Sequence, residues 1–290
     1  MQHSQFVVEG RKAIEDFLRE DYQPVALLTT RESEQERNSF RNGPTTSTSY
    51  EVVSSADMRQ MTGLSTACDA LAVFRKRNVF PEKYDNNSSS PLSEHKFLGH
   101  QSAMLHSPGS TFAREDLNID INLALDAVRD PGNLGTLIRM SDWFGLRHVL
   151  CSSDCCDCYN PKVVRATSGS LARVNVHYFD SLSDKLTELG VPVLGASMQG
   201  SNIYQPDAFP KNQQAVLVMG SEGQGLSREI EDMVESFVSI PAYAATKEGG
   251  AAHPMDAHTE TYEGNLRAES LNVAMAAGIL VSEIKRASGQ

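Results

Sequence analysis

The chain has 290 residues, of which 40% are hydrophobic and 22% charged, a globular composition that suffices for one or two domains. No stretch is long and apolar enough to cross a bilayer, and the start lacks the basic and apolar runs of a secretory signal, so we expect a cytoplasmic protein without a membrane partner. The net charge is −11, whereas proteins that contact phosphate usually carry a basic surface. Charge alone therefore does not indicate a nucleic-acid partner.

The first part of the chain reads as a small α/β unit over residues 1–80. Apolar side chains at helical spacing predict a helix within 6–18, and PVALLTT at 24–30 predicts a strand. YEVVSS predicts a second strand, SADMRQMTGL a short helix capped by Ser55, and ALAVFRKR a third strand. This size and mix of elements are typical of a separate small domain.

Two segments interrupt the regular pattern. Residues 81–118 are rich in Pro, Ser, Asn and His without a sustained period, which predicts a linker or insertion. Residues 242–269 are small and polar and include His253 and His258. Two interpretations of this second segment stay open: an insertion over a site that alters substrate choice, or an excursion without a role.

Strands and helices alternate from residue 119 to residue 290, which predicts an α/β fold with a parallel sheet. The expected strands are INLALDAV, RHVLCS, VNVHYF, VPVLGAS, QAVLVMGS and FVSIP. The expected helices are 133–144, closed by Gly145, then about 160–168, SLSDKLTELG, 227–234 and 270–286.

The five cysteines are an odd number, which favours reduced thiols over a disulfide framework. Four of them gather in the stretch 151–158, which contains the tetrapeptide CCDC. Zinc sites usually need a second cysteine pair at a distance, and none exists here. We therefore expect neither a metal nor redox chemistry from this cluster.

Polar turns follow three of the predicted strands, at the sheet edge where parallel α/β folds bind ligands. In RDPGNLGTLIRMSDWFG, Asn133 lies at a helix start and Arg139 about one and a half turns later. Periodicity alone favours a structural interpretation, in which Asn133 caps the helix and Arg139 forms a surface ion pair. The alternative is that both side chains face a ligand.

The second turn, VMGSEGQGLS, has three glycines that allow close backbone approach, but it matches neither the dinucleotide fingerprint nor a P-loop. Glu222 within it would repel phosphate and suits a cationic ligand better. In the third segment, SIPAY precedes the gap and ESLNVAMAAGILVSEIKR follows it. Ser270 as an N-cap and Asn272 as ordinary helix-start polarity are the structural interpretations.

Together these segments resemble the SpoU (TrmH-type) ribose methyltransferases of the SPOUT superfamily. DPGNLGTLIR is similar to the family's first motif, YNPKVVRATSGS to the stretch that follows it, MGSEGQGLS to the second motif, and SIP with ESLNVAMA to the third. FVVEGRKAIEDFL resembles the ribosomal-protein-like RNA-binding domain that many members carry. The gap at 242–269 is longer than is usual in the family.

The resemblance implies a SPOUT domain over 119–290 with a deep trefoil knot, preceded by an RNA substrate-binding domain over 1–80 and the linker 81–118. It also implies S-adenosylmethionine as cofactor, a homodimer, and an RNA substrate, either tRNA or rRNA. The cofactor would lie near Gly220, Ile240 and Leu271. The functional residues carried over by motif position are Asn133, Arg139, Glu222, Ser270 and Asn272.

The implied reaction is methyl transfer to a ribose 2′-hydroxyl. Because arginine keeps its proton below a pH of about 12, we expect Arg139 to hold the ribose and phosphate and to stabilise the forming alkoxide rather than act as a free base. Asn133 would fix the nucleotide or the arginine, Glu222 would orient Arg139 or favour the charged cofactor, and Ser270 and Asn272 would complete the pocket. The alternatives are an RNA-binding protein with an inactive methyltransferase fold and, last, a nucleotide-binding oxidoreductase, which lacks its glycine fingerprint here.

Overall fold

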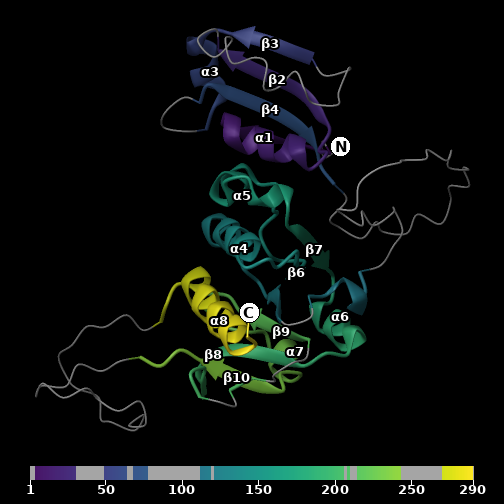
Figure 1. Ribbon diagram of the computed structural model, residues 1–290, viewed down its shortest axis with the longest axis vertical. Coiled ribbons are helices and arrows are strands. Elements are labelled where there is room, and N and C mark those ends of the chain that lie inside the picture. The colour runs from purple at the N-terminus through teal and green to yellow at the C-terminus, as the bar shows by residue number, and fades with distance from the viewer. Residues whose placement is uncertain are drawn as a thin grey trace, which may run out of the picture.

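Two sheets with helices between them form the described part of the protein (Figure 1). The structure is a computed structural model, and it describes residues 4–30, 49–63, 68–77, 112–118, 121–205, 208–209, 214–242 and 270–289. The first sheet is mixed, with strand order β1-β4-β2-β3, and the second is parallel, with order β10-β8-β9-β5-β6-β7. The predicted α/β fold with a parallel sheet is confirmed.

The N-terminal sheet confirms three predicted strands and adds one. Its elements are β1 (Gln5–Glu9), α1 (Arg11–Arg19), β2 (Pro24–Thr30), β3 (Ser49–Val53), α3 (Ser55–Met61) and β4 (Ala70–Arg75). The prediction of a helix from residue 6 is wrong, because Phe6 and Val8 point inward at strand spacing while β1 pairs antiparallel with β4. The predicted cap is also displaced by one residue: the Ser54 Oγ, not Ser55, accepts the Asp57 N–H at 3.1 Å.

All six strands predicted for the C-terminal sheet are present. The elements are η2 (Arg114–Asp116), β5 (Ile121–Leu125), α4 (Pro131–Trp143), β6 (His148–Ser152), α5 (Pro161–Thr167), η3 (Ser170–Ala172), β7 (Asn175–Phe179), α6 (Leu182–Leu189), β8 (Val193–Asn202), β9 (Ala215–Met219), α7 (Arg228–Glu231), β10 (Ser236–Ser239) and α8 (Val273–Ala287). Two predicted helices differ in extent, since α7 is a single turn and α8 begins after residue 272. Among the described helices, none combines the length and apolar character needed to span a membrane.

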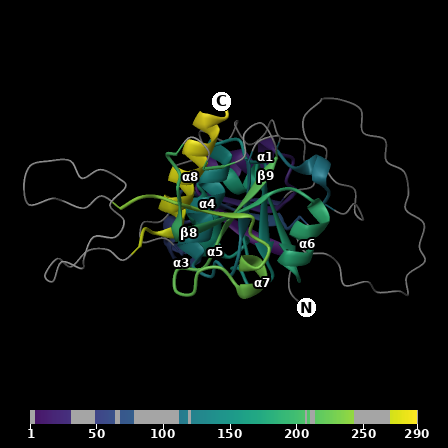
Figure 2. The ribbon, with the colours of Figure 1, turned by 90° about the horizontal axis from the view of Figure 1, so that it is seen from below.

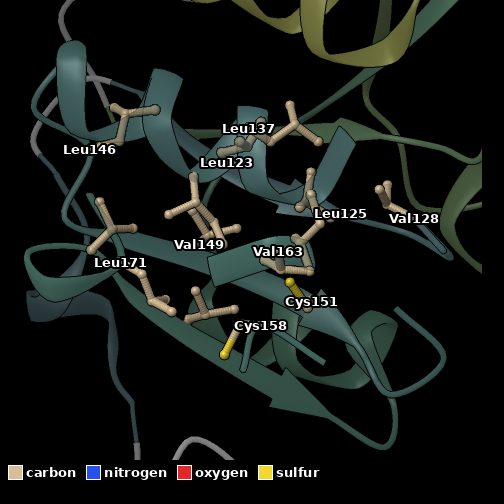
Figure 3. Close-up of a cluster of buried hydrophobic side chains, with 14 of the residues drawn as sticks. Leu123, Leu125, Val128, Leu137, Leu146, Val149, Cys151, Cys158, Val163 and Leu171 are labelled. Carbon is tan, nitrogen blue, oxygen red and sulfur yellow. The ribbon is translucent and has the colours of Figure 1, made fainter. Parts of the chain in front are cut away.

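The central strands β5 and β9 of the C-terminal sheet are buried on both faces. Figure 2 shows α4 and α8 on one side of the sheet and α6 on the other. Leu123 and Leu125 pack toward Leu137 of α4 and Val163 of α5 (Figure 3), whereas Ala124 packs in the cluster on the opposite face. Burial on both faces explains why nearly every residue of β5 is apolar. The parallel strands end together at one edge of the sheet.

The N-terminal unit packs against α5 and the turn before it (Figure 1). Arg165 of α5 forms an ion pair of 3.2 Å with Glu9, whose side chain is only 5% exposed. The same carboxylate accepts the Gly63 N–H at 2.7 Å, and the rings of Phe6 and Tyr159 lie 4.6 Å apart. One buried cluster therefore runs through both units and holds them in a fixed orientation.

The predicted linker 81–118 lies mostly outside the described residues. Its last part, 112–118, is described and is packed into the fold, with Phe112 and Leu117 both buried in the cluster that covers α6. The Phe112 ring lies 4.6 Å from the ring of His177 on β7. This end of the segment is thus anchored on the C-terminal sheet.

Gly135 decides how closely α4 approaches α5. A Cβ at this position would lie 2.4 Å from the Ala166 Cβ and 2.8 Å from the Val163 carbonyl oxygen. Gly135→Ala should therefore lower the free energy of unfolding by about 1–3 kcal/mol, because overpacking outweighs the gain in helix propensity. Urea unfolding measures the change.

The matched control for this prediction is Gly278→Ala in α8, where the nearest atom to a new Cβ is the Met140 Cγ at 3.8 Å. This variant should gain up to about 1 kcal/mol from helix propensity. Equal effects of the two substitutions would contradict the proposed contact between α4 and α5.

Candidate active site

Three segments meet at the carboxyl edge of the parallel sheet. The turn 126–130 follows β5 and leads into α4, the turn 220–227 follows β9, and the start of α8 lies beside them. Strands β5 and β9 are hydrogen-bonded neighbours, so their ends lie side by side. Ligands of open parallel sheets bind at this edge.

Asn133, Glu222 and Asn272 form one hydrogen-bonded group at this edge. The Asn133 Nδ2 donates to the Glu222 Oε1 at 2.5 Å, and the Asn272 Nδ2 donates to the same oxygen at 3.1 Å. The Asn272 Nδ2 also donates to the Asn133 Oδ1 at 2.8 Å. Three of the five predicted functional residues, far apart in the sequence, are thus brought into direct contact.

The helix caps leave these amides directed at the site. Asp130, not Asn133, caps α4, because its Oδ1 accepts the Asn133 N–H at 2.8 Å. The interpretation of Asn133 as an N-cap is therefore wrong. Asn272, not Ser270, caps α8, with its Oδ1 accepting from Ala274 at 3.0 Å, so its Nδ2 remains available to Asn133 and Glu222. Ser270 is exposed and precedes the cap.

Arg139 stands apart from this group. Its side chain is exposed, and its Nη1 donates to the Ser168 Oγ at 3.5 Å. Within the described residues no carboxylate pairs with it, which contradicts the surface ion pair. Glu222 binds the two amides and not Arg139, so one chain does not assemble all the predicted residues around a single point.

A cavity of about 260 Å³ opens beside the hydrogen-bonded group. It is lined by Ala127, Val128, Arg129, Asp130, Asn133, Ser221, Glu222, Gly223, Gln224 and Val273. This volume lies just below the range of about 300–1,000 Å³ that is typical of small-molecule sites. Arg129 is neutralised by Asp154 at 2.8 Å, so the remaining charged side chains of the lining, Asp130 and Glu222, are acidic.

The glycine turn holds Glu222 in place through its own backbone. Ser221 and Gly225 exchange two backbone hydrogen bonds of 2.9 and 3.0 Å. A Cβ on Gly220 would lie 2.2 Å from the Gly225 carbonyl carbon, so the close approach that the glycines predicted is here an approach of the chain to itself. Gly225 has a φ of +73°, which favours glycine.

The cofactor residues implied by the resemblance follow β9 and β10 or precede α8. Gly220 begins the glycine turn, Ile240 follows β10 and packs against the core, and Leu271 is 44% exposed directly before Asn272. Apolar surface for an adenosyl group and a carboxylate suited to a sulfonium charge therefore lie along the same edge, so the residues present fit S-adenosylmethionine.

Two acids in the turn after β5 escaped the sequence analysis. Asp126 is buried, and its Oδ2 accepts the Ser227 N–H at 2.6 Å, which ties the exit of β5 to the glycine turn. Asp130 caps α4 as described above. The available signal was an acid placed directly after a strand in which nearly every residue is apolar, where burial requires a hydrogen-bonding partner.

Comparison with known proteins shows a similarity to one family in the segment that contains this edge. Residues 120–247 match the model of the SpoU rRNA Methylase family. This segment of the chain is therefore similar to the SpoU family. A solved protein described as an RNA methyltransferase of the TrmH family, from Porphyromonas gingivalis, is 28% identical and superposes with a TM-score of 0.66 over 98% of this chain and 90% of its own.

Other matches extend the comparison of the SpoU segment. The 23S rRNA (guanosine(2553)-2′-O)-methyltransferase RlmP of Bacillus subtilis is 33% identical over 56% of this chain and 57% of its own, so the match spans little more than half of that relative. The SpoU methyltransferase AviRb from Streptomyces viridochromogenes, solved with AdoMet, shares the fold with a TM-score of 0.69 at 19% identity, over 98% of this chain and 90% of its own.

Replacing Asn133 by Asp tests the hydrogen-bonded group without changing its shape. The new carboxylate would face the Glu222 Oε1, now 2.5 Å from the Asn133 Nδ2, so a bond becomes a repulsion. Asn133→Asp should lower the free energy of unfolding by about 1 kcal/mol, a value limited by the exposure of the site.

Glu222→Gln in the same chain should restore most of this stability, because the glutamine amide can donate to the new carboxylate. The double-mutant cycle, measured by urea unfolding, should give a coupling of about 1 kcal/mol. Additive effects of the two substitutions would show that these side chains do not interact in solution.

Proposed function

We propose that this protein transfers a methyl group from S-adenosylmethionine to a ribose 2′-hydroxyl of a structured RNA. The observation that carries the proposal is the contact of Asn133, Glu222 and Asn272 beside a cavity of about 260 Å³, in a chain whose residues 120–247 match the SpoU family. The alternative is an RNA-binding protein with an inactive fold. The retention of all three polar side chains in one bonded group favours the enzyme.

The cofactor would be held by the backbone near Gly220, by Ile240 and by Leu271. When bound, S-adenosylmethionine supplies an electrophilic methyl group with a positive sulfonium charge. Glu222 is the acid of the group and favours that charge. Asn133 and Asn272 fix the carboxylate, and Ser270 adds a hydroxyl at the entrance of α8.

The target ribose would lie in the cavity, with Asn133 in hydrogen-bonding reach. Arg139 would hold the phosphate beside it and stabilise the negative charge that grows on the 2′-oxygen as its proton leaves. Its exposure and lack of a carboxylate partner in the described residues support this role, because a cation already neutralised would bind phosphate less well.

A homodimer is part of the proposal. Trp143 on α4 is 85% exposed and Met275 on α8 is 58% exposed, and these two helices pack against each other. Large apolar side chains at the surface of adjoining helices support a buried contact with a second copy. The deep trefoil knot is likewise proposed for the C-terminal part, from the family resemblance.

We propose residues 1–80 as the substrate-binding domain, 81–118 as the linker and 119–290 as the SPOUT methyltransferase domain. The contact of the N-terminal unit with α5 supports recognition of a large folded RNA, because two units joined in a fixed orientation can recognise the shape of a folded RNA. Ribosomal RNA is favoured over tRNA by the name of the RlmP relative. The five free cysteines support a reducing compartment such as the cytoplasm.

The experiment is methyl transfer from labelled S-adenosylmethionine to total RNA of cells that lack this gene, followed by mapping of 2′-O-methyl positions. Arg139→Ala should reduce the rate by at least about 100-fold, because it removes charge stabilisation of the transition state. Cofactor affinity, measured by calorimetry, should change less than about threefold, since the loss lies on the RNA side.

Arg147→Ala is the matched control, because Arg147 is an exposed arginine in the turn after α4 and lies outside the three motifs. It should keep the wild-type rate. Equal loss of rate and cofactor binding in Arg139→Ala would reject this division of roles. RNA binding without any cofactor binding would select the inactive alternative.

A further inference from the structure

One wall of the cavity is held from behind by the cysteine-rich loop. Residues 127–129 form the wall, and residues 152–156, which follow β6, form the loop behind it. Four bonds join them: Ala127 N to Ser152 Oγ at 2.9 Å, Val128 N to Cys155 Sγ at 3.3 Å, Cys156 N to Val128 O at 3.0 Å, and Arg129 Nη2 to Asp154 Oδ2 at 2.8 Å.

The wall needs this support because its backbone is strained. Ala127 has a φ of +56°, in the left-handed region that residues with a Cβ avoid at a cost of about 1–2 kcal/mol. Such a conformation persists only where the surroundings determine it from several sides. The hydrogen bonds of Ala127 and Val128 to the loop behind them hold the backbone in this conformation.

Cys155 is the central side chain of the support. Its thiol is 8% exposed; the sulfur accepts the buried Val128 N–H and donates to the Leu125 carbonyl oxygen at 3.3 Å. A hydrogen bond from Cys151 lowers the pKa of the Cys155 thiol, whereas burial raises the pKa of Cys151. Cys155 thus satisfies a donor and an acceptor that no water can reach.

We propose that Cys155, together with Ser152 and Asp154, positions the cavity wall 127–129 for the target nucleotide. The identity of the ligand rests on the proposed function, whereas the positioning of the wall rests on the four bonds alone. The wall continues into Asp130, which caps α4 and bonds to the Asn133 N–H, so a shift of the wall also moves Asn133. A displacement of about 1 Å is enough to cost about 100-fold in rate.

Cys155→Ala tests the proposal, and Cys158→Ala is its matched control. Both cysteines are buried in the same core cluster and both variants lose a sulfur atom, but the Cys158 N–H donates to the Tyr178 hydroxyl at 2.8 Å and not to the wall. Cys155→Ala should lower kcat by about 10- to 100-fold with an unchanged KM for S-adenosylmethionine. Cys158→Ala should lower kcat by less than about threefold, at a similar loss of thermal stability.

Cys155→Ser is the conservative rescue, because its hydroxyl can also accept the Val128 N–H and donate to the Leu125 carbonyl. It should restore kcat to within about tenfold of the wild type, given the shorter reach of oxygen. A kcat that falls equally in Cys155→Ala and Cys158→Ala would overturn the proposal, as would a Cys155→Ser variant no better than Cys155→Ala.

A second measurement does not require activity. Amide hydrogen exchange at Ala127 and Val128 should be faster in Cys155→Ala than in the wild type and unchanged in Cys158→Ala. If the wild-type protein methylates no RNA, the proposed function fails, and this exchange measurement alone decides whether Cys155 holds the wall. Unchanged exchange in Cys155→Ala would overturn the proposal in either case.

Discussion

Two side-chain amides converge on one carboxylate, and the arrangement of the site depends on this contact. Asn133 and Asn272 come from the first turns of α4 and α8, while Glu222 comes from the turn after β9. Each asparagine is also tied to its own helix start, through the Asn133 N–H to Asp130 and the Asn272 Oδ1 to Ala274. The group therefore couples the position of two helices to the position of one acid.

The acidic net charge is compatible with an RNA substrate because of how the cations are used. Several arginines are already neutralised within the fold, as Arg129 is by Asp154, Arg165 by Glu9 and Arg173 by Asp142. These paired arginines stabilise the fold and add little attraction for the phosphates of RNA. Arg139 is a cation that the described carboxylates leave unpaired, so local contact rather than the global field would bring RNA to the site.

Local patterns predicted the sheet but not the contacts between distant segments. Strands β5 and β9 were readable because both of their faces are buried and nearly every residue is apolar. Strand β1 was missed because the apolar residues at 7, 13, 14, 17 and 18 also fit a helical period, and Gly10, where the chain turns into α1, was not read as a boundary. The pairing of β1 with β4 is what makes this segment a strand, and the sequence around β1 alone does not specify that pairing.

In the candidate active site, too, local patterns did not predict the contacts between distant segments. Periodicity alone favoured Asn133 as a cap, since any Asn at a helix start is a good cap, and only the presence of Asp130 three residues earlier releases its side chain. The group of Asn133, Glu222 and Asn272 joins residues separated by 89 and 50 positions, which no local pattern specifies. Family resemblance named these residues, whereas the supporting bonds of Cys155 belong to no motif and appeared only in the fold.

The geometry of α4 bears on how the proposed homodimer could take part in the proposed reaction. Asn133 and Arg139 are six residues apart, which on an α-helix is about 9 Å along the axis and about 120° around it. Contacts with α5 at Gly135 and with α8 at Met140 fix the position of the helix, and because both side chains belong to one rigid helix, no rotation of α4 brings their Cα atoms to one face. A nucleotide bound at Asn133 would reach Arg139 if the RNA backbone passed around α4 or if, in the proposed homodimer, the partner subunit contributed its own arginine. The exposed Trp143, four residues beyond Arg139, favours the second arrangement, because a partner that covers this residue would also approach Arg139.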